Sequence, residues 1–81
     1  MDIRENMEKK YHEALSTYLK DQNEQALYQG QKISRLHIKY NISPEEIISM
    51  HKNNLMELYP ELPGKVLDSF DFLLEVMMAY A

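Results

Sequence analysis

No cysteine occurs among the 81 residues of this chain. Its absence excludes a disulfide framework and a thiolate metal site, and it fits a reducing cytosol. A single domain of this size buries only roughly 60–65% of the surface that its unfolded chain exposes, so its own core is thin. Stability must therefore come from tight helix packing or from self-association.

The sequence also lacks a concentrated block of positive charge. Its 13 acidic and 9 basic residues are spread along the chain, and the formal net charge is −4. Affinity for phosphate depends on a concentrated cationic surface. Nucleic acid is therefore a poor partner for this protein.

Long hydrophobic runs are missing as well. The amino terminus carries alternating charges where a signal peptide has an apolar run. Residues 70–81 are strongly apolar, but this stretch is too short to span a bilayer and contains Asp71 and Glu75. We therefore expect a soluble, cytoplasmic protein with no membrane partner.

No segment shows the period-two alternation of an amphipathic strand, which predicts an all-α fold over the single domain 1–81. The first helix is expected to begin at a capping box formed by Asp2 and Glu5 and to end near Lys20. Its apolar residues recur at helical intervals and define one inner face: Ile3, Met7, Tyr11, Ala14 and Tyr18.

A second capping box at Asp21 and Glu24 predicts a helix that runs to about Tyr40. Gly30 is expected on its inner face, where it weakens the helix by up to about 1 kcal/mol relative to alanine but lets a neighbouring helix approach closely. The other residues expected on this face are Ala26, Ile33, His37 and Tyr40.

The third helix has the clearest boundary. Ser43 is placed to cap it, with Pro44 at the first helical position and Glu46 reaching back, while Ile42 and Ile47 have the spacing of a hydrophobic staple. The helix is expected to stop before Pro60, because proline disfavours helical geometry in the preceding residue. Its predicted inward residues are Ile47, Ile48, His51, Leu55 and Leu58.

The fourth helix is expected to begin near Pro63 or Gly64, after a turn. Because the connections are short, successive helices should pack as antiparallel neighbours in a four-helix bundle. The residues predicted to face the core of the bundle from this helix are Val66, Phe70, Leu73, Leu74 and Met77.

Tyr28 is an aromatic residue on the polar face of the second helix. One interpretation is that its ring lies over the stems of Lys32 and Arg35. The other is that it anchors a protein interface, since tyrosine is enriched at contact hot spots.

The fourth helix is apolar on nearly every side. Phe72, Val76 and Ala79 flank its polar strip on one side and Met78 on the other. Such a helix is buried on more than one side, which predicts a homodimer formed through Phe72, Val76 and Ala79. The apolar pattern still continues at Ala81 without a stop signal, so we expect the helix to run on into a linker and a further domain.

Nothing in the sequence predicts catalysis or a bound cofactor. His12, His37 and His51 have no second ligand at the spacing of a helical metal site. His12 is expected to point outward, and the other two are expected to be hydrogen-bonded core residues.

Three carboxylates, Asp68, Asp71 and Glu75, share one helix face and could serve acid–base chemistry or bind magnesium, but they are expected to form a solvated polar strip. The helices around Asn41 and Ser43 resemble a helix-turn-helix, yet the second of them begins with Glu45 and Glu46 and would be repelled by phosphates. We therefore predict neither an enzyme nor a DNA-binding domain.

Several groups of residues follow one known family pattern: Tyr11-His12; Leu27-Tyr28-Gln29 with Gln31-Lys32 and Ser34-Arg35; Pro44-Glu45-Glu46-Ile47-Ile48-Ser49; Leu58-Tyr59-Pro60 with Leu62-Pro63; and Asp71-Phe72-Leu73 with Glu75-Val76-Met77. With them the chain closely resembles the amino-terminal domains of RsbU-type serine phosphatases of Bacillus-type bacteria. The resemblance covers essentially the whole chain.

This resemblance implies a non-catalytic regulatory domain of four helices that dimerises and recruits RsbT, a kinase-like switch protein. RsbT would stimulate a separate, manganese-dependent phosphatase domain of PPM type, in the sigma factor B pathway of the general stress response. The partner-binding residues implied for this chain are Glu24, Tyr28, Leu74 and Met78. The alternative is a purely structural homodimerisation module.

Overall fold

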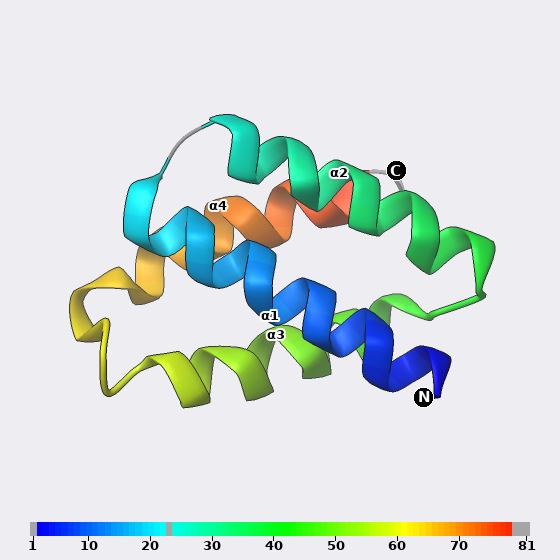
Figure 1. Ribbon diagram of the computed structural model, residues 1–81, viewed down its shortest axis with the longest axis horizontal. Helices are drawn as coiled ribbons and strands as arrows, with labels where there is room; N and C mark the ends of the chain where they lie inside the picture. The colour runs from blue at the N-terminus through cyan, green and yellow to red at the C-terminus, as the bar shows by residue number, and fades with distance from the viewer. Residues whose placement is uncertain (1, 23, 79–81) are drawn as a thin grey trace.

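The computed structural model describes residues 2–22 and 24–78, and all regular structure in these residues is helical, as predicted. The elements are α1 (Ile3–Asp21), α2 (Glu24–Lys39), α3 (Pro44–Leu58), the short 3-10 helix η1 (Pro63–Lys65) and α4 (Val66–Met77). The chain crosses the molecule along each helix and turns back at each connection (Figure 1).

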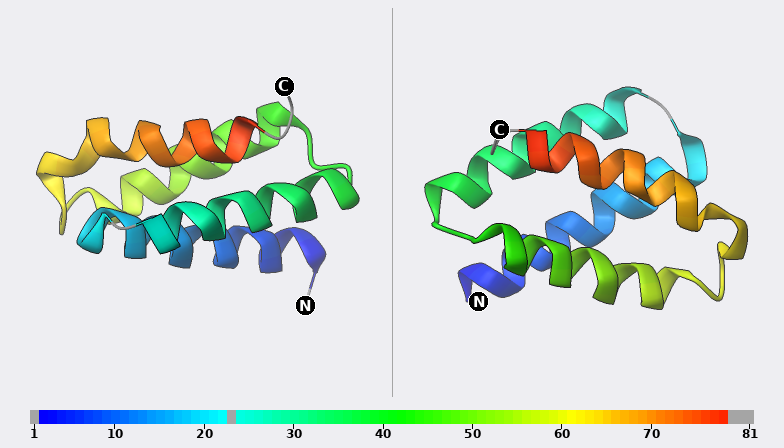
Figure 2. Two further views of the ribbon diagram at one scale, coloured as in Figure 1. Left: turned by 90° about the horizontal axis from the view of Figure 1, so that it is seen from above. Right: turned by 180° about the vertical axis from the view of Figure 1, so that it is seen from behind.

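Two helices form the middle of the bundle. In Figure 1, α1 lies in front and α4 behind, with α2 above and α3 below them. The view from behind in Figure 2 brings α4 to the front, beside α2. Accordingly, α1 and α4 contact each other, and both contact α2 and α3.

Of the three helix caps predicted from the sequence, only one is present in the part of the chain that the structure describes. The cap at Ser43 is confirmed: its Oγ accepts a hydrogen bond from the backbone N–H of Glu46 at 3.2 Å. The capping box at Asp2 is wrong, because its side chain makes no cap hydrogen bond. The box at Asp21 is also wrong. That residue ends α1, and Gln22 then turns the chain with a left-handed φ of 49°.

A tight turn closes α2 and leads into α3. Asn41 has a left-handed φ of 57°, and the N–H of Ile42 donates to the carbonyl of His37 at 2.8 Å. This is the pattern of a Schellman motif, in which the residue after the left-handed position packs back on the helix. Ile42 and Ile47 are both buried in the core.

The inner face of α1 is largely as predicted, although Ile3 is exposed. Its buried residues are Met7, Tyr11, Ala14, Leu15, Tyr18 and Leu19. In α3 the expected Ile47, His51 and Leu58 are buried, but Ile48 is exposed. Asn54 takes an inner position, where its side-chain amide donates to the Met50 carbonyl at 2.7 Å.

The close helix approach predicted at Gly30 is confirmed. A Cβ atom on Gly30 would lie 3.3 Å from Cε1 of Phe72 and 3.4 Å from Cγ2 of Val76. The missing side chain therefore gives Phe72 and Val76 the space to pack between α2 and the rest of the core.

The predicted orientation of α4 is wrong in part for this reason, although Leu73 and Met77 pack against the core as predicted. Phe72 and Val76 have no exposed surface and belong to the core of their own chain, so they are not on the outer side and cannot form the predicted dimer contact. Phe70 and Leu74 were expected inside and are exposed. Ala79, the third predicted dimer residue, lies outside the described residues.

Candidate protein-binding surface

The outer side of α4 carries a row of exposed apolar side chains. They are Leu67, Phe70, Leu74 and Met78, spaced three or four residues apart, so they follow one face of the helix. Leu67 is 81% exposed and Leu74 is 63% exposed. We call these four residues the α4 stripe. A row of this kind is a feature of interaction sites, because single exposed apolar residues are common but contiguous ones are not.

The carboxyl-terminal half of the α4 stripe lies beside α2. The side chain of Gln31 in α2 donates a hydrogen bond to Oε1 of Glu75 in α4. Leu74 directly precedes Glu75 in sequence, and Tyr28 lies one helical turn before Gln31. The bond therefore joins the turn of α2 that directly follows Tyr28 to the turn of α4 that carries Leu74.

Four residues predicted to bind a partner lie on these two neighbouring helices, and we call them the α2–α4 surface: Glu24, Tyr28, Leu74 and Met78. All four are exposed. Glu24 is the first residue of α2, one turn before Tyr28, and Met78 follows Leu74 by one turn. The bundle thus places the implied binding residues on the outside, where a second protein can reach them.

The ring of Tyr28 has a cationic neighbour within its own chain. Nζ of Lys32 lies 4.9 Å from the centre of the ring, within the range of a cation–π contact. The interpretation of Tyr28 as a ring covered by a basic side chain is confirmed for Lys32. Tyr28 nevertheless remains 49% exposed, so it is still available as a contact residue.

The three carboxylates of α4 do not act as one group. Asp68 pairs with Lys65 at 3.9 Å, and Glu75 accepts the hydrogen bond from Gln31. Asp71 and Asp68 lie near Tyr18, and their negative charges add to the effect of burial in raising the pKa of its hydroxyl. The carboxylates of the strip therefore interact with different elements: Asp68 with η1, Glu75 with α2, and Asp71, together with Asp68, with Tyr18 of α1.

A buried chain of hydrogen bonds holds α4 in its orientation. The Tyr11 hydroxyl lies 2.7 Å from Nδ1 of His51, and Nε2 of His51 lies 3.1 Å from Oγ of Ser69. Since the Ser69 hydroxyl donates to the Val66 carbonyl at 2.6 Å, it must accept from Nε2–H. Burial lowers the pKa of His51 to about 4, so the ring is neutral at physiological pH, and with its proton on Nε2 its Nδ1 accepts from the Tyr11 hydroxyl. The prediction of a hydrogen-bonded core histidine is confirmed here.

His37 does not match that prediction. It is fully buried, yet neither ring nitrogen has a hydrogen-bond partner within the described residues, and nor does Oγ of Ser34. Its ring stacks on Tyr11 with a centroid distance of 6.3 Å. Burial lowers the pKa of both His37 and His51 to about 4, so both rings are neutral at physiological pH.

His12 was expected to point outward but is partly buried between helices. Its Nδ1 lies 2.8 Å from Oδ1 of Asn54 and 3.6 Å from Oε2 of Glu57, both in α3. The histidine therefore joins α1 to α3, and the spacing of the sequence gave no sign of these partners.

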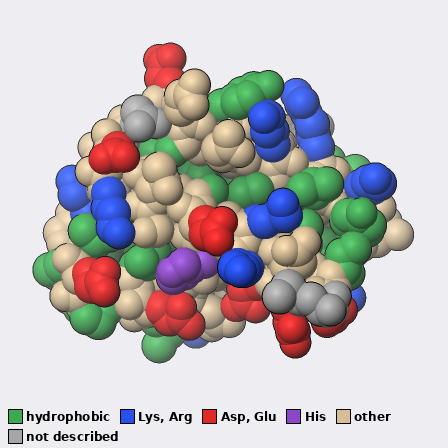
Figure 3. Space-filling view, in the orientation of Figure 1, with side chains coloured by type: hydrophobic (Ala, Val, Ile, Leu, Met, Phe, Trp, Pro, Cys, Tyr) green, Lys and Arg blue, Asp and Glu red, His purple; other side chains and the backbone are tan. Residues whose placement is uncertain are grey.

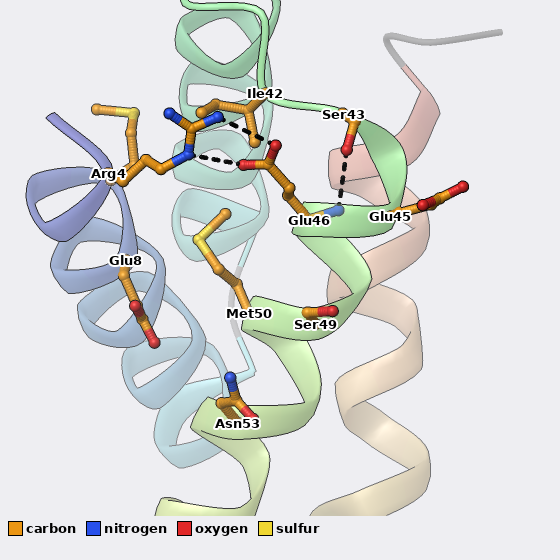
Figure 4. A pocket seen from close by; sticks show the side chains of 10 residues that line it. Arg4, Glu8, Ile42, Ser43, Glu45, Glu46, Ser49, Met50 and Asn53 are labelled. Atoms are coloured by element: carbon orange, nitrogen blue, oxygen red, sulfur yellow. Dashed lines mark hydrogen bonds and ion pairs between the residues drawn. The ribbon is translucent and has the colours of Figure 1, made fainter.

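A groove of about 440 Å³ lies between α1 and α3 (Figure 4). Arg4 crosses it and donates two hydrogen bonds to Glu46, at 3.0 and 3.1 Å. This contact lowers the pKa of Glu46 and raises that of Arg4. Because the two charges satisfy each other, the Arg4–Glu46 ion pair connects α1 to the start of α3 across the groove, and we do not take the groove as a ligand site.

Among residues 2–22 and 24–78, no group of three or more histidine, aspartate or glutamate side chains could hold a metal ion. In the same residues no helix is both long and apolar enough to cross a membrane. On the face shown in Figure 3, which is opposite α4, acidic and basic side chains are intermixed.

Sequence reasoning missed three parts of this surface. It did not identify Gln31 as the link to α4, and it did not place Leu67 or Phe70 on the outside. The i, i+3 and i+7 spacing of Leu67, Phe70 and Leu74 was a visible signal. It was ambiguous, because the opposite face of α4 is apolar at the same spacing.

Comparison with known proteins adds a second line of information. Residues 9–81 match the family model described as the N-terminal domain of phosphoserine phosphatase RsbU. Over 80 residues the chain is 54% identical to the phosphoserine phosphatase RsbU of Bacillus subtilis (strain 168), covering 99% of this chain and 24% of that protein. The chain thus spans about a quarter of this relative's length. No solved structure matches the chain.

Proposed function

The chain belongs to the family of RsbU N-terminal domains, which supports a regulatory role, and from this we propose that it recruits the switch kinase RsbT to activate a serine phosphatase of PPM type. In this proposal the domain is non-catalytic and works in the cytoplasm, in the sigma factor B pathway of the general stress response. RsbT binds the α2–α4 surface.

The observation that carries the proposal is the arrangement of this surface. Tyr28, Leu74 and Met78 are exposed on two helices that the Gln31–Glu75 hydrogen bond holds together. An exposed aromatic residue and two exposed large apolar residues, with polar neighbours such as Glu24 and Gln31, have the composition of a protein-binding hot spot.

Activation follows from population shift. A partner that binds one arrangement of α4 more tightly than another moves the protein toward that arrangement by its difference in affinity. The hydroxyl of Ser69, which donates to the Val66 carbonyl within α4, accepts from His51 and fixes α4 to α3, so a change at the α2–α4 surface acts on a helix with defined core contacts.

Manganese does not fit the described residues, which include no cluster able to bind a metal ion. In this proposal, the manganese that serves the phosphatase reaction binds in a separate phosphatase domain. This chain contributes recruitment and not chemistry.

Calorimetry with purified RsbT tests the proposal. The unaltered chain is expected to bind, whereas Tyr28→Ile and Met78→Asn should weaken binding by at least ten-fold, because each removes a central contact worth over about 1.4 kcal/mol. Helicity measured by circular dichroism controls for folding, since both positions are exposed. If RsbT does not bind the unaltered chain, or binds all three alike, the proposal is wrong.

The second candidate is a purely structural homodimerisation module, and the amino-terminal half of the α4 stripe favours self-association. Leu67 and Phe70 are exposed there, away from the Gln31–Glu75 contact. A second copy covering them would bury the apolar area that the chain leaves in water.

Sedimentation equilibrium distinguishes the two candidates. Phe70→Glu should shift a dimer toward monomer, while Tyr28→Ile should leave the mass unchanged. A dimer that persists in Phe70→Glu would mean that the two chains associate elsewhere.

A further inference from the structure

The aromatic face of Tyr28 is covered by the Lys32 side chain, which few other contacts hold in place. Lys32 is exposed, its Nζ lies 4.9 Å from the ring centre, and no other hydrogen bond or ion pair holds it within the described residues. An exposed cation–π contact of this kind contributes little stability. A competing cation can therefore displace the Lys32 ammonium at low cost.

The charges around the ring favour such a cation. Glu24 lies one turn before Tyr28 in the same row of α2, and it makes no ion pair within the part of the chain that the structure describes. On α4, Asp71 makes no ion pair with any described residue, and Glu75 accepts a hydrogen bond from the neutral amide of Gln31. These three carboxylates of the two neighbouring helices outnumber the two basic residues in the turns of α2 that follow Tyr28, Lys32 and Arg35.

Apolar surface for the stem of the incoming residue is also present. Leu74 and Met78 are exposed beside the Gln31–Glu75 contact. Lysine and arginine bury their methylene stems on such surfaces while the charged head remains at the edge. The α2–α4 surface therefore offers an aromatic face and an apolar support, and its own Glu24 together with Asp71 and Glu75 of α4 supplies carboxylates that lack ion pairs within the described residues.

We propose that the binding partner places a lysine or arginine side chain over the Tyr28 ring, where it displaces the Lys32 ammonium of the free domain. This inference rests on the proposed function, because it assigns the chemistry of the group that the recruited partner supplies. Lys32 acts as an internal competitor, which occupies the ring until the partner arrives.

A gain of affinity tests the inference. Lys32→Met removes the competitor but keeps a side chain of similar length, so it should strengthen RsbT binding two- to five-fold, which is the fold-change expected from an exposed cation–π contact. Tyr28→Phe retains an aromatic face. It should bind within two-fold of the unaltered chain, and Lys32→Met should give the same gain in that background.

A matched control comes from the far end of α2. Nζ of Lys39 lies 5.5 Å from the centre of the Tyr40 ring, so Lys39→Met removes the same charge and the same type of contact away from Tyr28. It should leave RsbT affinity unchanged. An equal gain from both variants would attribute the effect to net charge and would overturn the inference.

The remaining outcomes separate the two proposals. If the unaltered chain binds RsbT but Lys32→Met binds it equally well or more weakly, the inference is wrong and the proposed function stands. If the unaltered chain does not bind RsbT, both are wrong. Weaker binding at higher salt in every variant is expected as well, because salt screens the attraction between the incoming cation and the carboxylates near the ring.

Discussion

The Tyr11 hydroxyl lies 2.7 Å from Nδ1 of His51 at the centre of the bundle, where α1 meets α3. The same imidazole donates to Ser69 of α4, so one neutral histidine connects three helices. Both Tyr11 and His51 are buried, which means that water cannot replace a lost partner.

Tyr11→Phe is expected to lower the free energy of unfolding by about 1–3 kcal/mol, because it leaves Nδ1 of His51 as a buried acceptor without a donor. Urea denaturation followed by circular dichroism measures this loss. Tyr18→Phe is a matched control, since Tyr18 is also buried but its hydroxyl makes no hydrogen bond within the described chain. Equal losses of unfolding free energy for the two variants would show that the Tyr11–His51 hydrogen bond does not itself stabilise the fold.

Gly30→Val should destabilise the fold by about 1–3 kcal/mol or more, because its branched side chain must enter the space that Phe72 and Val76 occupy. The midpoint of urea denaturation reports the change. Gly64→Val provides the control, since a Cβ atom there would meet nothing within 4 Å. A Gly30→Val variant as stable as the unaltered chain would contradict the close packing of α2 on α4.

Acid should destabilise the domain through its two buried histidines. The folded-state pKa of each is about 4, below the ordinary value of 6.5, so the unfolded chain takes up protons that the folded chain excludes. Stability that is fully present above pH 6.5 is therefore lost as the pH falls toward 4. Between pH 7.5 and 5 the expected loss is about 2 kcal/mol per histidine.

His37→Leu isolates half of this effect. The variant should be about 1–2 kcal/mol more stable at pH 7.5, because it removes two buried nitrogens that lack partners. It should also lose only about half as much stability between pH 7.5 and 5. Urea denaturation at both pH values gives the comparison. An unchanged pH dependence would show that His37 does not titrate between the folded and unfolded states as expected.

Ser43→Ala should cost about 1 kcal/mol, because the hydrogen bond from the Glu46 N–H to Ser43 Oγ caps α3. Asp2→Ala is the matched control at the start of α1, where the side chain makes no such bond. Its effect on the thermal midpoint should be clearly smaller. The reverse order would indicate that Ser43 does not stabilise α3 through its cap.

The sequence predicted the secondary structure well where local chemistry decides it. The cap at Ser43, the end of α3 before Pro60 and the inner face of α1 depend on neighbours within a few residues. It failed at Asp2 and Asp21, where the capping spacing is present but the bonds are not. Spacing permits a cap, and the path of the chain decides whether it forms.

Among the implied partner-binding residues, Tyr28 was recognisable because one aromatic residue stood on a polar face. Leu74 was placed both in the core and in the partner site, and the structure leaves it 63% exposed. The hydrogen bond that brings its helix beside the helix of Tyr28 joins Gln31 and Glu75, which are 44 positions apart, and no local pattern contains such a contact.

By itself, then, the sequence determined that this protein is all-helical, roughly where its helices begin and end, and that Gly30 permits a close helix contact. Only the tertiary structure decided which side of α4 faces inward. Because α4 is apolar on two opposite sides, periodicity alone does not distinguish them. The space beside Gly30 admits Phe72 and Val76, and this packing turns Leu67, Phe70, Leu74 and Met78 outward, where a partner can reach them.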